Sequence, residues 1–320
     1  MNVSSGPGPV SGAGGLRALR DLMVARFVSA GVPTPVVDAE LLLCYVLGLT
    51  RGQLQVQIAL GDRRVDAPER TALAALVQRR CRREPLQHLT GRAPFRALEL
   101  AVGPGVFIPR PETELVAQLA IDDLRAARVA AAATGLDPFA VTEPGALTRL
   151  RAVDLCSGSG AIALAMATEV PGVRVWAVEK SPEAYAWLTR NVAESGVTTL
   201  IPVLSDLGTA VPELDGTVAV VASNPPYVPI GMVPREPEVQ LFDPELALYG
   251  GDDGLDVVRA LSLRAGALLR PGGTLIIEHG EYQSASVAAL LSADGWGEIS
   301  HHHDLTGRER VTRTVKLSVA

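Results

Sequence analysis

The segment Arg151-Ala152-Val153-Asp154-Leu155, followed by Cys156-Ser157-Gly158-Ser159-Gly160, decides the fold class of this chain. Its first half is short and apolar, as in a buried strand, and the residues after it from Ala161 to Thr168 predict a helix. Glycines allow a sharp turn and the close approach of a ligand at a helix N-terminus. The segment therefore predicts a strand, a cofactor loop and a helix, although a Gly-x-Gly loop alone is weak evidence.

Three further apolar runs each end in a polar side chain. They are Val173 to Val178 before Glu179, Leu200 to Leu204 before Ser205-Asp206, and Val218 to Ser223 before Asn224. Ligands of parallel sheets bind outside the carboxyl ends of the strands, where a carboxylate such as Glu179 suits two ribose hydroxyls. Each acid alone also fits a helix cap or a turn, but four strands together predict one ligand-binding edge of a sheet.

The turn Asn224-Pro225-Pro226-Tyr227 carries the most specific chemistry. Two prolines fix the backbone and remove two N–H donors, which leaves carbonyl groups free to accept hydrogen bonds. The Asn adds a carbonyl, and the Tyr ring adds a flat apolar wall. This combination suits a planar NH2 group, although Pro-Pro also ends strands in ordinary turns.

The ordered set of motifs resembles the peptide chain release factor N5-glutamine methyltransferases, a family of class I S-adenosylmethionine-dependent methyltransferases. The resemblance runs from about Leu16 to the C-terminus. Its segments are Pro85 to Gly91, Ile108 to Glu114, Asp154 to Ala163, Ser223 to Val228, Glu245 to Gly251, Asp253 to Asp256, Pro271 to Gly273 and Asp304 to Arg310. Cys156, Glu179 and His88 depart from the residues usual in the family, which are Gly, Asp and Tyr, and Cys156 makes the first loop position less flexible.

The resemblance implies an α/β fold with a doubly wound, seven-stranded, mostly parallel sheet whose last strand is inserted antiparallel. It implies S-adenosyl-L-methionine as cofactor, S-adenosyl-L-homocysteine as product, and the glutamine of a release factor's Gly-Gly-Gln motif as substrate. The implied cofactor-binding residues are Asp154, Cys156, Ser157, Gly158, Ser159, Gly160, Glu179, Asp206, Leu207 and Asn224. Asn224 and Pro225 are the implied catalytic residues, and Pro226 and Tyr227 bind substrate with them.

The chain divides into predicted regions of different character. Residues 1–15 are rich in Gly, Pro and Ser and predict a disordered tail without signal-peptide features. Residues 16–92 show helical periodicity and predict a substrate-recognition bundle. Residues 93–110 predict a β-hairpin linker with its turn at Gly103-Pro104-Gly105, and 111–320 the methyltransferase domain, with a variable insertion at 126–150.

Composition favours a cytoplasmic enzyme of 320 residues that is 48% hydrophobic. No apolar run approaches the ~20 residues of a membrane helix, and three scattered cysteines predict no disulfide framework. A net charge of −6 and only 4% aromatic residues argue against sequence-specific nucleic-acid binding. A local basic patch at Arg79, Arg80, Arg82 and Arg83 remains open.

Several other residues have two interpretations each. Neighbouring histidines on a strand point to opposite faces, so His301 to His303 predict a solvated strand end better than a metal site, and no metal is expected. Glu278 and His279 form an acid/base pair, or Glu278 is structural or lines the pocket. Arg110 and Glu112 belong to a surface turn or line the pocket.

An amide nitrogen is a poor nucleophile because its lone pair is delocalised. Catalysis therefore depends on alignment, with the Asn224 and Pro225 carbonyls accepting the two amide N–H groups, and a shifted general base is not required. The same turn suits the exocyclic amine of adenine, so adenine-N6 methylation of DNA or RNA is the alternative activity. A degenerate cofactor-binding scaffold is a third interpretation, disfavoured because each pocket position keeps its chemistry.

Overall fold

The computed structural model describes residues 15–61, 63–133 and 150–318. The predicted tail lies almost wholly, and the insertion largely, outside these ranges. The described chain forms two compact units. The bundle unit contains the residues up to Gly91 together with Arg235–Phe242, and the sheet unit contains Arg92–Pro234 and the residues from Asp243 onward. Residues 235–242, expected within the methyltransferase domain, thus group with the bundle.

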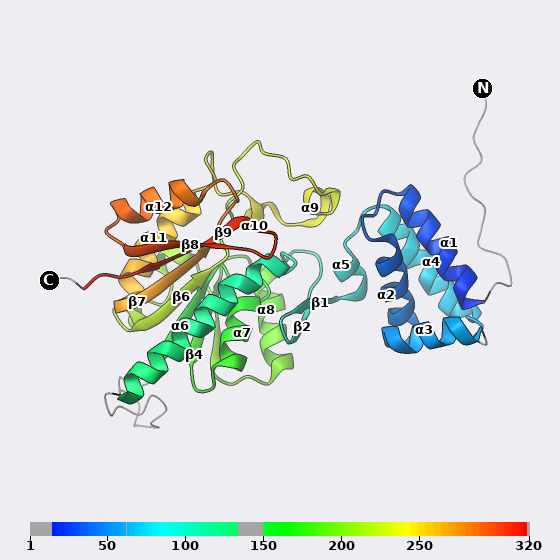
Figure 1. Ribbon diagram of the computed structural model, residues 1–320, viewed down its shortest axis with the longest axis horizontal. Helices are drawn as coiled ribbons and strands as arrows, with labels where there is room; N and C mark the ends of the chain where they lie inside the picture. Colours follow the sequence, from blue (N-terminus) through cyan, green and yellow to red (C-terminus); the bar gives the residue numbers. More distant parts are fainter. Residues whose placement is uncertain (1–14, 62, 134–149, 319–320) are drawn as a thin grey trace. The chain divides into compact units, whose positions relative to one another are not determined.

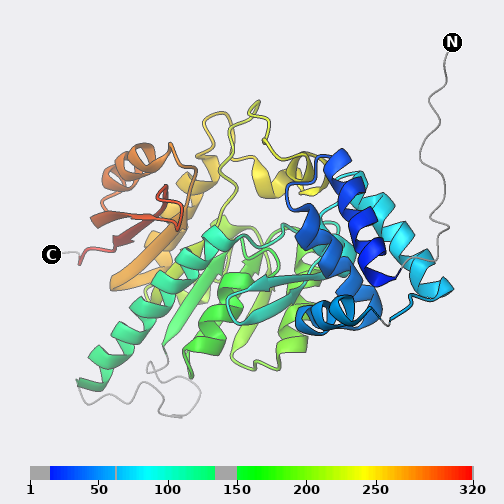
Figure 2. The same cartoon turned by 45° about the vertical axis from the view of Figure 1, so that its right-hand side comes forward.

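The bundle unit consists of helices, and those before Gly91 pack around one apolar core (Figures 1 and 2). Large side chains such as Phe27, Leu42 and Leu54 are completely buried in it. Its helices are α1 (Leu16–Ser29), α2 (Pro35–Leu47), α3 (Arg51–Leu60), α4 (Ala67–Cys81), α5 (Leu86–Thr90) and α9 (Pro237–Phe242). The predicted helical character of this region is confirmed.

Helix α3 is the element of the bundle that periodicity did not reveal, since only Leu54 and Ile58 are buried on it. Its ends nevertheless carry clear signals. Thr50 and Gln53 form a capping box, and Gly61 ends the helix with φ of +77°. Helix α4 likewise begins with a capping box, formed by Asp66 and Glu69.

Two arginines of the cluster at 79–83, Arg80 and Arg83, are engaged in ion pairs within the bundle unit. Arg80 is buried and pairs with Asp38 at 2.7 Å, and it also pairs with Glu238 of α9 at 2.9 Å. Arg83 binds the same Glu238 carboxylate. Because a buried ion pair must be complete to be tolerated, Arg80 and Arg83 serve the interior of the bundle unit. Arg79 pairs with Glu84 at the surface, and Arg82 is exposed.

A small antiparallel hairpin opens the sheet unit, as predicted, but its turn is not where the sequence placed it. It joins β1 (Arg92–Phe95) to β2 (Leu98–Ala101). The turn lies at Arg96, which has φ of +52° and is held by an ion pair with Glu169. A turn does form at 103–106, with Val106 N donating to Gly103 O at 3.4 Å, but no strand of the described chain follows it before Pro111, so the prediction that it joins the hairpin strands was wrong. Gly103 packs against Trp187, where an added Cβ would lie 2.5 Å from the ring.

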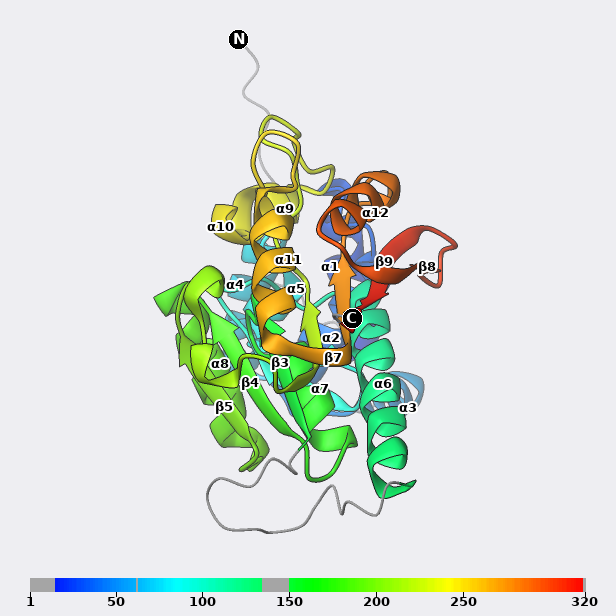
Figure 3. The same ribbon diagram turned by 90° about the vertical axis from the view of Figure 1, so that its left-hand side faces the viewer.

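The main sheet has the predicted topology. Among the described residues its seven strands run in the order β5-β4-β3-β6-β7-β9-β8, with β9 antiparallel to both of its neighbours (Figures 1 and 3). The strands are β3 (Arg151–Leu155), β4 (Arg174–Glu179), β5 (Leu200–Leu204), β6 (Val218–Ser223), β7 (Leu269–Glu278), β8 (Gly297–His303) and β9 (Glu309–Val315). The class I methyltransferase order and the inserted antiparallel strand are both confirmed.

Helices cover both faces of this sheet, because successive strand residues point to opposite sides. Ala152 and Val220 face one core, and Val153 and Val221 face the other. The first core is covered by α6 (Glu114–Ala133), α7 (Ala161–Glu169) and α8 (Pro182–Ser195), and the second by α11 (Asp256–Leu268) and α12 (Ser284–Ala293). The short helix α10 (Glu245–Leu248) follows the loop after β6.

Candidate active site

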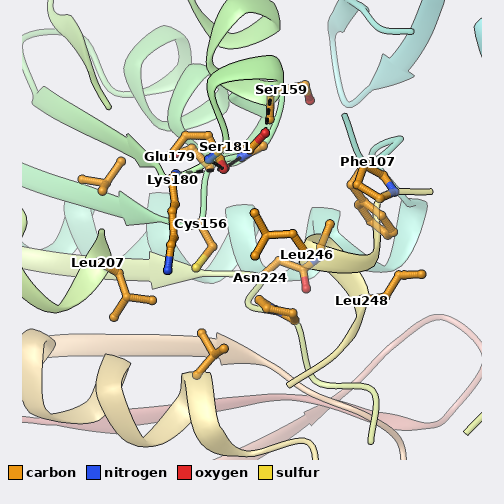
Figure 4. Close-up of a pocket in the computed structure, with 18 of the residues that line it drawn as sticks. Phe107, Cys156, Ser159, Glu179, Lys180, Ser181, Leu207, Asn224, Leu246 and Leu248 are labelled. Carbon is orange, nitrogen blue, oxygen red and sulfur yellow. Dashed lines mark hydrogen bonds between the residues drawn. The ribbon is translucent and has the colours of Figure 1, made fainter. Parts of the chain in front are cut away.

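A cavity of about 340 Å³ lies in the sheet unit, at the carboxyl ends of β3 to β6 (Figure 4). It has two sides. The glycine-loop wall consists of Cys156–Ser159, Glu179–Ser181 and Asp206-Leu207, and the proline-turn wall consists of Thr113, Asn224, Pro226–Val228 and Leu246–Leu248. In Figure 4, Asn224 lies between Cys156 on one side and Leu248 and Phe107 on the other.

All but three of the predicted site residues line this cavity; the three exceptions are Asp154, Gly160 and Pro225. Asp154 is completely buried beneath the glycine loop and accepts a hydrogen bond from Ala163 N at 3.1 Å. Burial raises the pKa of Asp154 to about 7. The structure therefore gives Asp154 a place under the loop, where it holds the first turn of α7.

The glycine loop turns sharply because residues of left-handed conformation alternate in it. Cys156, Gly158 and Gly160 have φ values of +63°, +56° and +87°. A side chain at Gly160 would meet Leu188 at 2.6 Å, so this position requires glycine for packing as well as for conformation. Cys156 adopts a strained conformation for a residue with a side chain, at the position where the family usually has glycine.

Glu179 ties the loop to the end of β4. Its Oε2 accepts from Gly158 N at 2.8 Å, and its Oε1 accepts from Lys180 N at 2.9 Å and Ser181 N at 2.7 Å. A carboxylate offers about four lone-pair sites, so Oε2 keeps capacity for a further donor. The buried carboxylate thus orders the glycine-loop wall and still faces the cavity.

Asp206 lies at the outer end of the same wall. Its carboxylate is about half exposed and pairs with Lys180 Nζ at 2.9 Å. The hydrogen bond from Lys180 lowers the pKa of Asp206, so the side chain stays ionised. Lys180 is a cavity residue that the sequence analysis missed, although it directly follows the predicted Glu179.

The side chains of the proline turn are held from behind. Asn224 donates from Nδ2 to Thr113 Oγ1 at 3.1 Å, which leaves its side-chain carbonyl for another partner. The Tyr227 hydroxyl donates to Glu278 Oε1 at 3.2 Å. Burial raises the pKa of Tyr227, so its phenol remains a neutral donor.

The backbone of the turn is braced by the segment that follows α10. Val228 N donates to Leu248 O at 2.8 Å, and Gly250 N donates to Val228 O at 2.9 Å. A Cβ at Gly250 would lie 2.5 Å from Pro226 O. A Cβ at Gly254 would lie 2.2 Å from Tyr227 O. The motif from Gly250 to Gly254 therefore keeps glycine so that two backbone segments can touch.

The motif from Ile108 to Glu114 contributes to the cavity, but not through Arg110 and Glu112, for which lining the pocket was one of two interpretations. Pro109 and Thr113 line it, whereas Arg110 and Glu112 do not. Arg110 instead pairs with the buried Asp243 at 2.7 Å. The sequence analysis did not name Thr113 as a cavity residue. Its position inside this motif, at the start of a helix, was the one sequence feature that pointed to it.

The structure also places Glu278 and the histidines, for which the sequence left two interpretations. Glu278 ends β7, buried behind the cavity rather than lining it. His279 bonds Thr312 Oγ1 through Nε2 at 2.8 Å, and His301 contacts the same hydroxyl. Within the described ranges, no group of three or more His, Cys, Asp or Glu side chains is arranged to hold a metal ion.

Segments of both units match models of known protein families. The family model described as "PrmC N-terminal domain" matches residues 18–91, and the one described as "Methyltransferase small domain" matches residues 141–233. A release factor glutamine methyltransferase of Streptomyces coelicolor is 46% identical over 287 residues, which cover 89% of this chain and 92% of that protein. The chain belongs to the release factor glutamine methyltransferase family.

Two further relatives show the range of proteins to which this family member is similar. A release factor glutamine methyltransferase of Bifidobacterium longum is 42% identical, covering 88% of this chain and 92% of that protein. A 4-amino-L-phenylalanine/4-methylamino-L-phenylalanine methyltransferase of Streptomyces pristinaespiralis is 36% identical, covering 88% of each. As for membranes, none of the helices in the described part of this methyltransferase family member is long and apolar enough to cross one.

Proposed function

We propose that the protein transfers a methyl group from S-adenosyl-L-methionine to the side-chain amide nitrogen, N5, of the glutamine in the Gly-Gly-Gln motif of peptide chain release factors. One observation carries the proposal. Asn224 of the proline turn shares a single cavity with the glycine loop and Glu179. A site for a planar NH2 group thus adjoins a site suited to a nucleoside cofactor.

The glycine-loop wall fits S-adenosylmethionine by its donor and acceptor set. Glu179 Oε2 accepts only one backbone N–H and has room for a ribose hydroxyl. Leu207 and Val178 add apolar surface, and the volume of about 340 Å³ lies within the ~300–1,000 Å³ of small-molecule sites. When bound, the cofactor supplies an activated methyl group on a sulfonium; this wall holds and orients it.

The proline-turn wall would orient the amide. The Asn224 side-chain carbonyl and the Pro225 backbone carbonyl each accept one N–H of the substrate NH2 group, so the nitrogen faces the cofactor side. Positioning of this kind lowers barriers by roughly 7–11 kcal/mol in favourable cases. The same carbonyl dipoles stabilise the positive charge that develops on nitrogen. Tyr227, neutral because burial raises its pKa, packs on the substrate side chain.

The bundle unit would recognise the folded release factor, and the product would be S-adenosyl-L-homocysteine. This assignment is supported by the match of residues 18–91 to the model described as "PrmC N-terminal domain". Asp38 and Glu238 neutralise Arg80 and Arg83, which reduces the cationic surface at 79–83 and favours a protein over a nucleic acid as partner. A release factor substrate also implies work in the cytoplasm, where translation terminates.

Methyl transfer from labelled cofactor tests the proposal directly. The purified protein is incubated in parallel with a release factor, with the same factor carrying Glu for the Gln of its Gly-Gly-Gln motif, with duplex DNA and RNA, and with 4-amino-L-phenylalanine. We expect one methyl group on the glutamine, located by mass spectrometry, and none on the Glu variant. Preferential labelling of nucleic acid would favour adenine-N6 methylation, and labelling of the free amino acid would favour an arylamine substrate.

A further inference from the structure

Thr113 and Glu278 lie behind the side chains that would hold the substrate amide. Thr113 ends the 3-10 turn Pro111–Thr113 and is 4% exposed. Glu278 ends β7 and is 3% exposed. Neither residue belongs to the proline turn, yet Thr113 contacts Asn224, and Glu278 contacts Tyr227. The two polar side chains of the turn are therefore anchored from outside it.

The hydrogen bond between Asn224 and Thr113 determines which end of the Asn224 side chain faces the cavity. An Asn side chain has a donor end and an acceptor end, and only the acceptor end can receive an N–H from a substrate amide. In the structure Nδ2 faces Thr113 Oγ1 at 3.1 Å, so the carbonyl end is left for the cavity. If Thr113 gave its own hydrogen to Asn224, the amide would be reversed and would present N–H groups to the substrate.

Glu278 anchors the other polar side chain of the turn. Its Oε1 accepts a hydrogen bond from the Tyr227 hydroxyl at 3.2 Å. Burial raises the pKa of Glu278 to about 7, and Arg310 opposes that rise while Glu112 adds to it. Thr113 and Glu278 therefore each accept a hydrogen bond from one polar side chain of the turn.

We propose that Thr113 and Glu278 are positioning residues: Thr113 holds the Asn224 amide with its carbonyl toward the cavity, and Glu278 holds the Tyr227 hydroxyl. Each polar side chain of the turn thus has its own buried anchor. The inference rests on the proposed function, because an acceptor at Asn224 matters for a substrate that brings an NH2 group. It adds two residues to the machinery without placing either on the reacting atoms.

Variants of Thr113 test the inference through turnover. Thr113→Val removes the acceptor and leaves the Asn224 N–H unpaired, so we expect kcat to fall roughly 10- to 100-fold with little change in cofactor affinity by calorimetry. Thr113→Ser keeps the hydroxyl and should restore kcat to within about threefold. Glu278→Gln keeps an acceptor for the Tyr227 hydroxyl and should give a smaller loss than Thr113→Val. Thr274→Val, another buried threonine on β7, is the matched control and should leave kcat unchanged.

A second measurement does not depend on the substrate. In nuclear magnetic resonance spectra, the Asn224 side-chain NH2 should exchange hydrogen faster with solvent in Thr113→Val than in the wild type or in Thr274→Val. The inference is overturned if exchange is unchanged, if kcat of Thr113→Val stays within twofold of wild type, or if only cofactor affinity falls, since Thr113 would then bind cofactor directly. A wild-type protein inactive on release factor would refute the proposed function, and the exchange measurement would still decide the inference.

Discussion

The two walls of the cavity are built in different ways. The glycine-loop wall is local, since Glu179 binds the backbone of Gly158, Lys180 and Ser181, all within about one βαβ unit. The proline-turn wall is assembled from segments far apart in sequence, with Thr113 and Glu278 on either side of it in the chain. A local wall depends on conformation that the chain adopts by itself, whereas the assembled wall depends on the completed fold.

The largest expected effect comes from removing the centre of the assembled wall. Asn224→Ala should lower turnover on a release factor by roughly 10²–10³, the range for one preorganised transition-state contact. Cofactor affinity should stay nearly intact, as calorimetry can check. Asn224→Asp keeps an acceptor and should retain more activity than Ala, with cofactor affinity unchanged or slightly improved. Near-wild-type turnover of Asn224→Ala would show that this is not the amide site.

Disturbing the glycine segment that braces the proline turn should affect the proline-turn wall less than Asn224→Ala does. Gly254→Ala puts a Cβ 2.2 Å from Tyr227 O, at φ of +77°, and must shift the turn. We expect roughly tenfold lower kcat/KM and about 2–3 kcal/mol lower stability in denaturant unfolding. Gly272→Ala is the control, because it has φ of +73° but open space around it. It should cost only the conformational part, about 1–2 kcal/mol, and spare kcat/KM.

The local wall is tested through cofactor affinity. Glu179→Ala leaves three backbone N–H groups without their acceptor and removes the site for a ribose hydroxyl, so binding should weaken by about 1–3 kcal/mol. Asp206→Ala should weaken it less, because its exposed carboxylate pairs with Lys180 in solvent. If calorimetry found equal losses for the two variants, or no loss for either, Glu179 would not be the stronger cofactor ligand of the pair.

The smallest expected effect is on the pH dependence of stability, to which one buried carboxyl behind each wall contributes. Burial raises the pKa of both Asp154 and Glu278 to about 7, with Glu179 adding to the first, and Glu112 adding to and Arg310 opposing the second. The folded state therefore holds protons that the unfolded state releases, so stability is greatest at low pH and falls as pH rises toward 7. Between pH 6 and 7 we expect about 1 kcal/mol per group.

Denaturant unfolding at a series of pH values from 5 to 8 checks this dependence. Asp154→Asn and Glu278→Gln should each remove part of the slope below pH 7, because each replaces a titrating group by an amide. A slope that is unchanged in both variants would show that other groups titrate in this range.

The difference between the walls also explains what the sequence could predict. The strands, the glycine loop and Glu179 follow from local patterns of apolar runs, glycines and terminal acids, and the order of the sheet was confirmed. Thr113 gives no such pattern. Glu278 does end an apolar strand and was noted as structural or pocket-lining, but its contact with Tyr227 could not be predicted, because it depends on β7 reaching the proline turn. That contact exists only in three dimensions.

The hairpin and α3 show the same limit on a smaller scale. The glycines at 103–105 look like a hairpin turn, but Gly103 is small because Trp187 packs against it. Helix α3 has weak periodicity and is revealed only by its capping residues. Apolar spacing predicted burial well, whereas the reason for a particular glycine required its tertiary neighbour.

The placement of α9 within the bundle unit bears on how this enzyme can be inherited or engineered. The backbone leaves the bundle at Gly91, returns at Arg235 and leaves again at Phe242, so the unit is discontinuous in the gene. Glu238 from the later segment pairs with Arg80 and Arg83 from the earlier one. A fusion or truncation made at residue 91 would separate Glu238 from Arg80 and Arg83. The bundle unit therefore cannot be exchanged at a single junction. Chimeras between relatives should carry residues up to 91 and 235–242 from the same parent.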